Sequence, residues 1–212
     1  MAKEKKLAAN TDVLISTFQL TKHIGGDLLD NWLAADGVLS PWQQELLNKV
    51  YQKSLNHIRG WNEEELKMKL LSFLFLISEV EEENRISTFF ERSMSAVING
   101  HLLSVTCDCL IASPLGYNTP QTPYFFLQEF KKEKEHSSDP EGQMLAAMLI
   151  AQAMNKDEKP IYGAWLTGST WIFTVLHQKN YYFSNNFDAT NKVNLNKIVF
   201  ILRKLKALVL EA

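Results

Sequence analysis

The chain has 212 residues, of which 46% are hydrophobic and 22% are charged, the balance of one globular domain with or without an extension. The formal net charge is −2 and the isoelectric point is about 6.2, so a protein that coats nucleic acid over a large surface is disfavoured. A local basic groove remains compatible with this charge.

The sequence carries no mark of export or membrane insertion. The first residues, MAKEKKLAANTD, are charged and lack the apolar segment of a signal peptide. The longest apolar stretch, Leu70 to Val80, is interrupted by serines and Glu79 and is too short to cross a bilayer. The two cysteines, Cys107 and Cys109, are too close in sequence to cross-link distant segments. We therefore expect a cytoplasmic protein in a reducing compartment, without a membrane partner.

The first part of the chain is predicted to be helical. Residues 1–60 would form an N-terminal helical extension, and residues 61–212 would form the main domain. Ser40 is placed to cap a helix that has Pro41 in its first turn, and Gly60 ends this helix.

A second helix is predicted from about Asn62 to about Glu82. Glu63 aligns with its buried side, because it lies three residues before the first of several apolar positions at helical spacing. Those positions are Leu66, Leu70, Phe73, Leu74 and Ile77. A carboxylate on a core-facing stripe is unusual and marks Glu63 as a candidate functional residue.

From about residue 89 the pattern becomes that of strands. Asn99-Gly100 is a strong hairpin signal, and it separates strands predicted at Phe89 to Ile98 and at His101 to Ala112. Alternation along the second strand places Asp108 on one face. The opposite face would hold Val105, Cys107, Cys109 and Ile111.

A loop rich in proline leads to a third predicted strand, Tyr124 to Lys131. Its nearly continuous apolar character suits a central strand that is covered on both faces. The strand ends in Glu129-Phe130-Lys131, so that alternation places two charges on one face.

The rest of the chain alternates helix and strand. A helix begins at Asp139-Pro140-Glu141, which supplies a cap, a first-turn proline and a first-turn acid, and it runs to about Asn155. The elements predicted after it are strands at Ile161 to Thr167, Thr170 to His177 and Tyr181 to Ser184, and a last helix from about Asn191. This order indicates an α/β fold in which helices flank a mixed sheet.

Three charged residues could form one site. If the second and third strands are neighbours, Asp108, Glu129 and Lys131 can converge on one sheet face. Two carboxylates and the backbone carbonyl of Phe130 make an oxygen-rich site that suits Mg²⁺, which would lower the pKa of a bound water. Lys131 could orient or deprotonate that water or stabilise the transition state. The alternative is a buried charge network that only fixes strand register.

The arrangement resembles the PD-(D/E)XK nuclease superfamily, on the basis of Asp108 in TCDCLIAS and Glu129-Phe130-Lys131 in YFFLQEFKK. This resemblance implies a restriction-endonuclease-like core of helix, three-strand meander, helix and strand. The segment WNEEELKMKLL is similar to the first helix of the nuclease domain in type I restriction enzyme motor subunits, which makes Glu63 the helix carboxylate. The segment DPEGQMLAAML is similar to the helix after the third strand, which places Gln143 at the glutamine position of that helix.

The resemblance covers about Trp61 to Ser184 and includes departures from the pattern. Cys107 precedes Asp108 where proline is common, and Ala147 stands where the RecB-like branch has tyrosine. The sequence has no helicase or methyltransferase motif, so a complete type I subunit is excluded. The same blocks also resemble a group of bacterial proteins that adds no function beyond the superfamily.

The expected function is a metal-dependent nuclease that hydrolyses phosphodiester bonds, and DNA is the expected substrate. The sequence leaves the oligomeric state open, with a homodimer as one option. Asp108, Glu129, Glu63 and the Phe130 carbonyl would bind Mg²⁺ or Mn²⁺, and Gln143 would position water or phosphate. The alternative is a catalytically inactive nuclease-fold protein that binds nucleic acid or a protein partner. An active site requires the Asp108 and Glu129 carboxylates to approach within about 5 Å.

Overall fold

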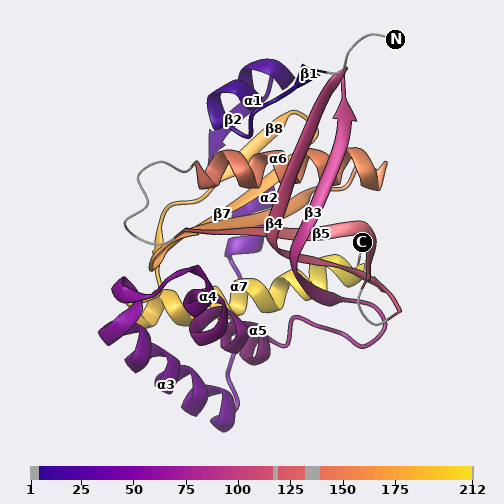
Figure 1. Ribbon diagram of the computed structural model, residues 1–212. Helices are drawn as coiled ribbons and strands as arrows, with labels where there is room; N and C mark the ends of the chain where they lie inside the picture. Colours follow the sequence, from indigo (N-terminus) through magenta and orange to yellow (C-terminus); the bar gives the residue numbers. More distant parts are fainter. Residues whose placement is uncertain (1–4, 117–118, 132–138, 212) are drawn as a thin grey trace.

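The computed structural model describes residues 5–116, 119–131 and 139–211, but not the side chains of residues 5, 125–129, 131 and 211 (Figure 1). Nine strands in these ranges form one mixed sheet, and the helices lie on its two faces. The strands are β1 (Lys5–Lys6), β2 (Thr21–Ile24), β3 (Ser87–Ile98), β4 (His101–Leu115), β5 (Thr119–Lys131), β6 (Ile161–Thr167), β7 (Thr170–His177), β8 (Asn180–Phe183) and β9 (Phe187–Asp188). The α-helices are α1 (Thr11–Phe18), α2 (Asp27–Leu33), α3 (Pro41–His57), α4 (Glu63–Leu66), α5 (Ser72–Ser78), α6 (Pro140–Asn155) and α7 (Lys192–Glu211).

The central part of the sheet begins with an antiparallel meander of β3, β4 and β5. The chain then passes through α6 and returns as β6, which runs parallel to β5, and β6 forms a hairpin with β7. The full order is β1-β4-β5-β6-β7-β8-β2, with β3 paired to β4 and β9 paired to β7. The predicted α/β class, with a mixed sheet flanked by helices, is confirmed.

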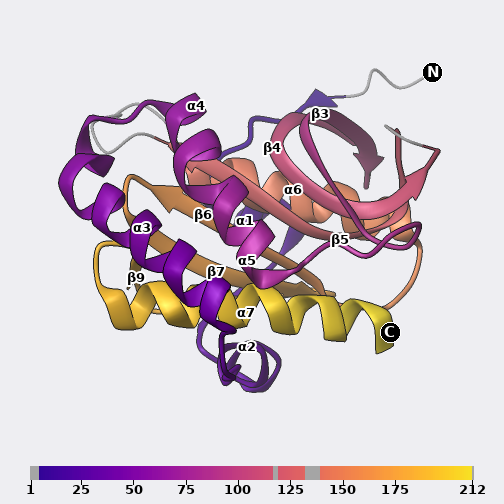
Figure 2. The same cartoon turned by 90° about the horizontal axis from the view of Figure 1, so that it is seen from below.

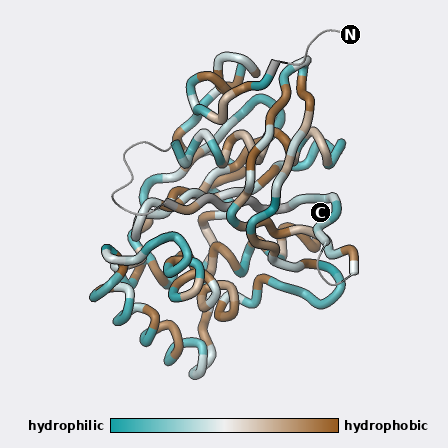
Figure 3. Tube along the Cα trace, viewed as in Figure 1, coloured by the Kyte–Doolittle hydropathy of each residue, from teal (hydrophilic) through white to brown (hydrophobic). Residues whose placement is uncertain are grey.

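Helices cover both faces of the sheet, as Figures 1 and 2 show from two directions. α1 and α6 share one buried cluster with the sheet, whereas α2, α3, α5 and α7 share the other. Along these helices hydrophobic and hydrophilic residues alternate, as expected for elements that bury one side (Figure 3). No helix in the described part of the chain combines the length and the apolar character needed to cross a membrane.

Several predicted elements are confirmed closely. The hairpin of β6 and β7 has the predicted bounds, and α6 begins after Asp139, whose carboxylate accepts a hydrogen bond from the Gly142 N–H. Ser40 and Gln43 form a capping box at the start of α3. Asn62 and Glu65 do the same for the next helix. In each case the local sequence supplies the hydrogen-bond partners that the first helical turn lacks.

The segment before residue 61 is not purely helical, which corrects one prediction. β2 pairs with β8 in parallel and β1 pairs with β4 in parallel, so this segment contributes both outer strands of the main strand path. The domain boundary at residue 60 stays a prediction. These two strands are short, and their partners lie far along the chain, so local periodicity gave no signal for them.

Two further predicted boundaries are wrong. The helix that begins after Asn62 ends at Ser78, where Glu79 adopts a left-handed conformation with φ 56°, and not near Glu82. The proline-rich loop is largely strand, because β4 and β5 remain paired to Leu115 and Thr119. Register shifts between Ile111 and Ser113 let this hairpin bend and accommodate its prolines.

The alternation predicted for β4 is also wrong. Cys107 packs in the cluster on the α6 side of the sheet, whereas Cys109 and Ile111 pack in the cluster on the α7 side. The strand therefore changes the face that its odd-numbered residues present at Asp108. The physical reason is a local irregularity in the β3–β4 pair, where Glu91 has a positive φ and is not paired with Asp108.

Candidate functional site

Asp108 is a buried carboxylate in the middle of β4. The residue is 7% exposed, and its Oδ2 accepts a hydrogen bond of 2.8 Å from the backbone N–H of Phe130 in β5. The β4–β5 pairing ends at Cys109 and Gln128, directly before this point. The Asp108 side chain thus continues the strand pairing and lies against the backbone of the Glu129-Phe130-Lys131 segment.

Lys67 is the second buried charge of the site. It begins a π-helical turn, η2 (Lys67–Leu71), that links α4 to α5 in one continuous helix, and it is 7% exposed. Its Nζ lies 3.7 Å from Asp108 Oδ1 and 3.2 Å from Glu64 Oε1, and it donates a hydrogen bond to Glu91 Oε1. One ammonium group therefore joins carboxylates from the helix, β3 and β4.

Lys67 remains protonated throughout the physiological range. Burial alone would lower the pKa of its ammonium group, but the Glu91 hydrogen bond, the charge of Asp108 and the Glu64 hydrogen bond together outweigh burial. The pKa of Lys67 consequently lies well above its ordinary value. The site thus holds a permanent internal cation beside a buried acid.

Two backbone irregularities meet at this cluster. A π-helical turn is rare and often marks a functional position, and Lys67 is its first residue. Glu91 has φ 54°, which is uncommon for a residue with a side chain, and it separates the paired residues Phe90 and Arg92 in β3. Strained conformations of this kind concentrate at functional sites, where the surrounding structure holds them in place.

The predicted residues Glu129 and Lys131 lie in β5, where their backbones pair with Trp165 and Thr167 of β6. Their side chains are outside what the structure describes, so the predicted approach of the Asp108 and Glu129 carboxylates stays a prediction. The same holds for any direct role of Lys131. What the structure brings together is Asp108 and the backbone between those two residues.

The predicted residues Glu63 and Gln143 lie in two different helices, α4 and α6. Glu63 is half-buried in the first turn of α4, four residues before Lys67 and thus on the same helix face. Gln143 lies in the first turn of α6, and its buried Oε1 has no hydrogen-bond partner among the described residues. A buried acceptor without a partner is costly, so the side chain of Gln143 stays a candidate for binding a water or an ion.

Sequence reasoning did not assign a role to Lys67 or Glu91. A signal for Lys67 was present, because it follows Leu66 and precedes Leu70 by three residues, so it shares the buried stripe that singled out Glu63. Glu91 gave only a weak signal, as one charge in an apolar strand. Its left-handed backbone conformation cannot be read from the sequence.

The described residues include no group of three or more His, Cys, Asp or Glu side chains arranged to hold a metal ion. Cys107 and Cys109 are buried free thiols, and burial raises the pKa of the Cys109 thiol well above its usual value. A thiol in this state is a poor nucleophile and a poor metal ligand.

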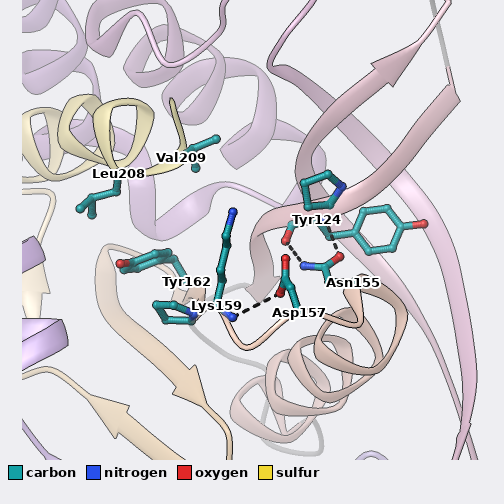
Figure 4. Close-up of a pocket in the computed structure, with 9 residues that line it drawn as sticks. Tyr124, Asn155, Asp157, Lys159, Tyr162, Leu208 and Val209 are labelled. Atoms are coloured by element: carbon teal, nitrogen blue, oxygen red, sulfur yellow. Dashed lines mark hydrogen bonds between the residues drawn. The ribbon is translucent and has the colours of Figure 1, made fainter. Parts of the chain in front are cut away.

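A separate pocket of about 190 Å³ lies at the C-terminus of α6, beside Tyr124 of β5 (Figure 4). Tyr124, Tyr162 and residues of α7 form its walls, and Lys159 extends into it. Asn155 fixes one wall, because its side chain bonds both the N–H and the carbonyl of Tyr124, at 2.8 and 2.9 Å. None of the residues that line this pocket belongs to the Asp108 cluster.

The sequence matches no protein-family model and no curated protein.

Proposed function

We propose that the protein is a metal-dependent nuclease that hydrolyses phosphodiester bonds, with DNA as the substrate. The observation that carries the proposal is the hydrogen bond between Asp108 Oδ2 and the Phe130 N–H. It links a buried acid on the second strand of the meander to the Glu-x-Lys segment on the third. That is the arrangement that the resemblance to PD-(D/E)XK nucleases implies.

The topology supports the same proposal. The element order from α4 to β6 is helix, three-strand meander, helix and strand, and the sequence resemblance implies the same order of elements. β4 is antiparallel to its neighbours β3 and β5, and β5 and β6 are parallel. Fold alone does not assign chemistry, so the proposal depends on the residues at the strand ends.

The proposed ligands offer oxygen atoms, which a hard divalent cation such as Mg²⁺ or Mn²⁺ prefers. Asp108 offers a carboxylate whose side chain is 10% exposed, and Gln143 offers a buried amide oxygen that no described residue satisfies. Asp108, Glu129 and the Phe130 carbonyl would hold the ion, and Glu63 could add a further carboxylate. A bound ion of this kind would supply charge neutralisation at the phosphate and a more acidic water.

The residues of the chain would divide the remaining work. Lys131 would orient the attacking water or accept its proton, and Gln143 would position water or a phosphate oxygen. The hydrogen bond from Phe130 fixes the carboxylate plane of Asp108 before any substrate arrives. Such preorganisation lowers the cost of assembling the site during the reaction.

The test is cleavage of supercoiled plasmid, linear duplex and single-stranded DNA with Mg²⁺ or Mn²⁺. The wild type should cut at least one substrate, and Asp108→Ala and Lys131→Ala should each lose at least about 100-fold in rate. Asp36→Ala is the matched control, because Asp36 is exposed and lies in the connection between α2 and α3. Equal loss in the control, or metal-independent cutting, would contradict the proposal.

A second candidate is a catalytically inactive nuclease-fold protein that binds nucleic acid or a protein partner. One observation favours it: Asp108 Oδ1 faces Lys67 while Oδ2 accepts from Phe130, so the chain satisfies both oxygens internally. A structural ion pair would look the same. Intact folding together with no cleavage and no heat of Mn²⁺ binding in calorimetry would select this alternative.

A further inference from the structure

Lys67 lies between one buried acid and two acids that face the solvent. The Asp108 side chain is 10% exposed, whereas the Glu91 and Glu64 side chains are 53% and 75% exposed. The exposed pair is also the nearer pair, because Nζ is hydrogen-bonded to Glu91 and Glu64 but lies 3.7 Å from Asp108 Oδ1. The ammonium is thus held mainly by its outer partners.

We propose that Lys67 is a resident cation that competes with a divalent metal ion for Asp108 and shifts onto Glu91 and Glu64 when the metal binds. This inference rests on the proposed function, in which Asp108 is a metal ligand. It adds a residue that sets the metal affinity of the site. Lys67 would act on the metal through the charge of Asp108, without contacting substrate.

The electrostatics require competition if a metal binds at Asp108. Two cations that share one carboxylate repel each other, and a largely buried site screens this repulsion poorly. Lys67 can yield at moderate cost, because its flexible four-carbon stem keeps two carboxylate partners when Asp108 is released. A lysine paired with Asp108 alone would be left buried and uncompensated.

The left-handed conformation of Glu91 fits this role. Its φ of 54° interrupts the regular β3 geometry at the residue whose carboxylate meets Lys67. The ammonium is also 5.9 Å from the centre of the Phe130 ring, so it lies beside the backbone segment proposed to hold the ion. The outer partner and the inner site are therefore both within reach of one side chain.

A lysine that only positions Asp108 would have the opposite effect on metal binding. Removing a positioning residue disorders the carboxylate and weakens the site, whereas removing a competing cation strengthens it. The sign of the change in metal affinity therefore separates the two roles, and the measurement needs no cleavage activity.

The experiment is a calorimetric titration of Mn²⁺ into wild type, Lys67→Gln, Lys67→Arg and the double variant Lys67→Gln with Asp108→Asn. Lys67→Gln should bind Mn²⁺ at least about ten-fold more tightly than wild type, and Lys67→Arg should stay close to wild type. The double variant should lose the gain. Lys49→Gln is the matched control, since it changes the net charge equally at an exposed pair on α3.

Each outcome decides the inference. Equal or weaker binding by Lys67→Gln overturns it, as does a gain that survives Asp108→Asn or appears in Lys49→Gln. If Lys67→Gln binds Mn²⁺ more tightly, if this gain depends on Asp108, and if the protein cuts no DNA, the inference is supported and the nuclease proposal is contradicted. DNA cleavage together with an unchanged Mn²⁺ affinity of Lys67→Gln supports the nuclease proposal and overturns the inference. If no variant binds Mn²⁺, both are overturned.

Lys67 is buried, so Lys67→Gln could fail to fold, and a measurement on the wild type covers that case. The ammonium resonance of Lys67 can be followed by NMR in protein with ¹⁵N-labelled lysine and assigned through its loss in Lys67→Arg. Mg²⁺ should shift this resonance saturably while leaving the exposed Lys49 unchanged. A Lys67 resonance that does not respond to Mg²⁺ overturns the inference.

Discussion

Two parts of the sheet differ in how regularly their strands are paired. In the β6–β7 hairpin each residue from Ile161 to Thr167 pairs with one residue of β7 in an unbroken register. In the β3–β4 pair the register is interrupted at Glu91 and Asp108, and the helix beside it contains a π-turn. The buried charged residues of the described chain, Lys67 and Asp108, both belong to the second part.

This difference shows where stability and function are placed in the molecule. The regular part buries large apolar side chains, among them Trp171 and Phe173, both fully buried. In the irregular part, the backbone departs from regular geometry, and opposite charges are held together below the surface. Departures from local rules are expected at functional sites and are compensated by well-packed regions elsewhere.

The largest expected effect comes from the regular part. Phe173→Ala removes a fully buried ring that packs against Trp32, Trp171 and Phe187. The free energy of unfolding should fall by about 3–5 kcal/mol, because the surrounding core cannot fill the cavity. Urea denaturation measures this, and a loss below about 1 kcal/mol would show that the regular part is not the stabilising one.

Asp108→Ala should have the next largest effect on stability. It removes the acceptor for the Phe130 N–H and one of the partners of buried Lys67, which keeps Glu91 and Glu64. A loss of about 1–3 kcal/mol is expected, because a buried donor is left without its acceptor. Exposed Asp36→Ala should stay within about 0.5 kcal/mol of wild type. An equally neutral Asp108→Ala would contradict the described contacts.

The left-handed conformation of Glu91 predicts an inversion of the usual preference for alanine over glycine. Glu91→Gly should be more stable than Glu91→Ala by about 1 kcal/mol, because only glycine adopts positive φ without strain. At Ser95, in the regularly paired part of β3, glycine should instead be the less stable variant. The same order of stability at both positions would remove the distinction between regular and irregular backbone.

The smallest expected effect concerns Asp188 in β9, beside the regular part. Burial raises the pKa of its carboxyl, but hydrogen bonds from Thr190 and Ser169 and the charge of Arg59 together outweigh burial, so the pKa lies below its ordinary value. Wild type should therefore exceed Asp188→Asn in stability by well under 1 kcal/mol at neutral pH. Thermal unfolding as a function of pH should show this difference vanish as the pH falls below about 4.

The regular elements could be predicted from sequence because their signals are local. The apolar periodicity and the proline after Asp139 are enough to place α6, and Gly168 marks the turn between β6 and β7. The pairing of β2 with β8 could not be predicted, since it depends on contacts between distant segments. The face change between Cys107 and Cys109 follows from the irregularity at Asp108, which alternation cannot anticipate.

The candidate site was predicted only in part for the same reason. Asp108 was identified from its place in an apolar strand, and the structure places it against the Phe130 backbone. The local pattern assigns Lys67 no functional role, because lysine side chains normally face the solvent, although its position on the helix is a buried one. Its burial depends on acids from two strands, which no helical pattern reveals.

The parallel pairing of β2 with β8 has a consequence for the order in which the protein assembles. His23 and Asn180 are joined by a 3.1 Å side-chain hydrogen bond although 157 positions separate them in the chain. During synthesis, β2 leaves the ribosome long before its partner exists, so this edge of the sheet can close only after β8 (Asn180–Phe183) has been made. Contacts of such long range slow folding, and until they form the backbone groups of β8 at this edge are open to pairing with another chain.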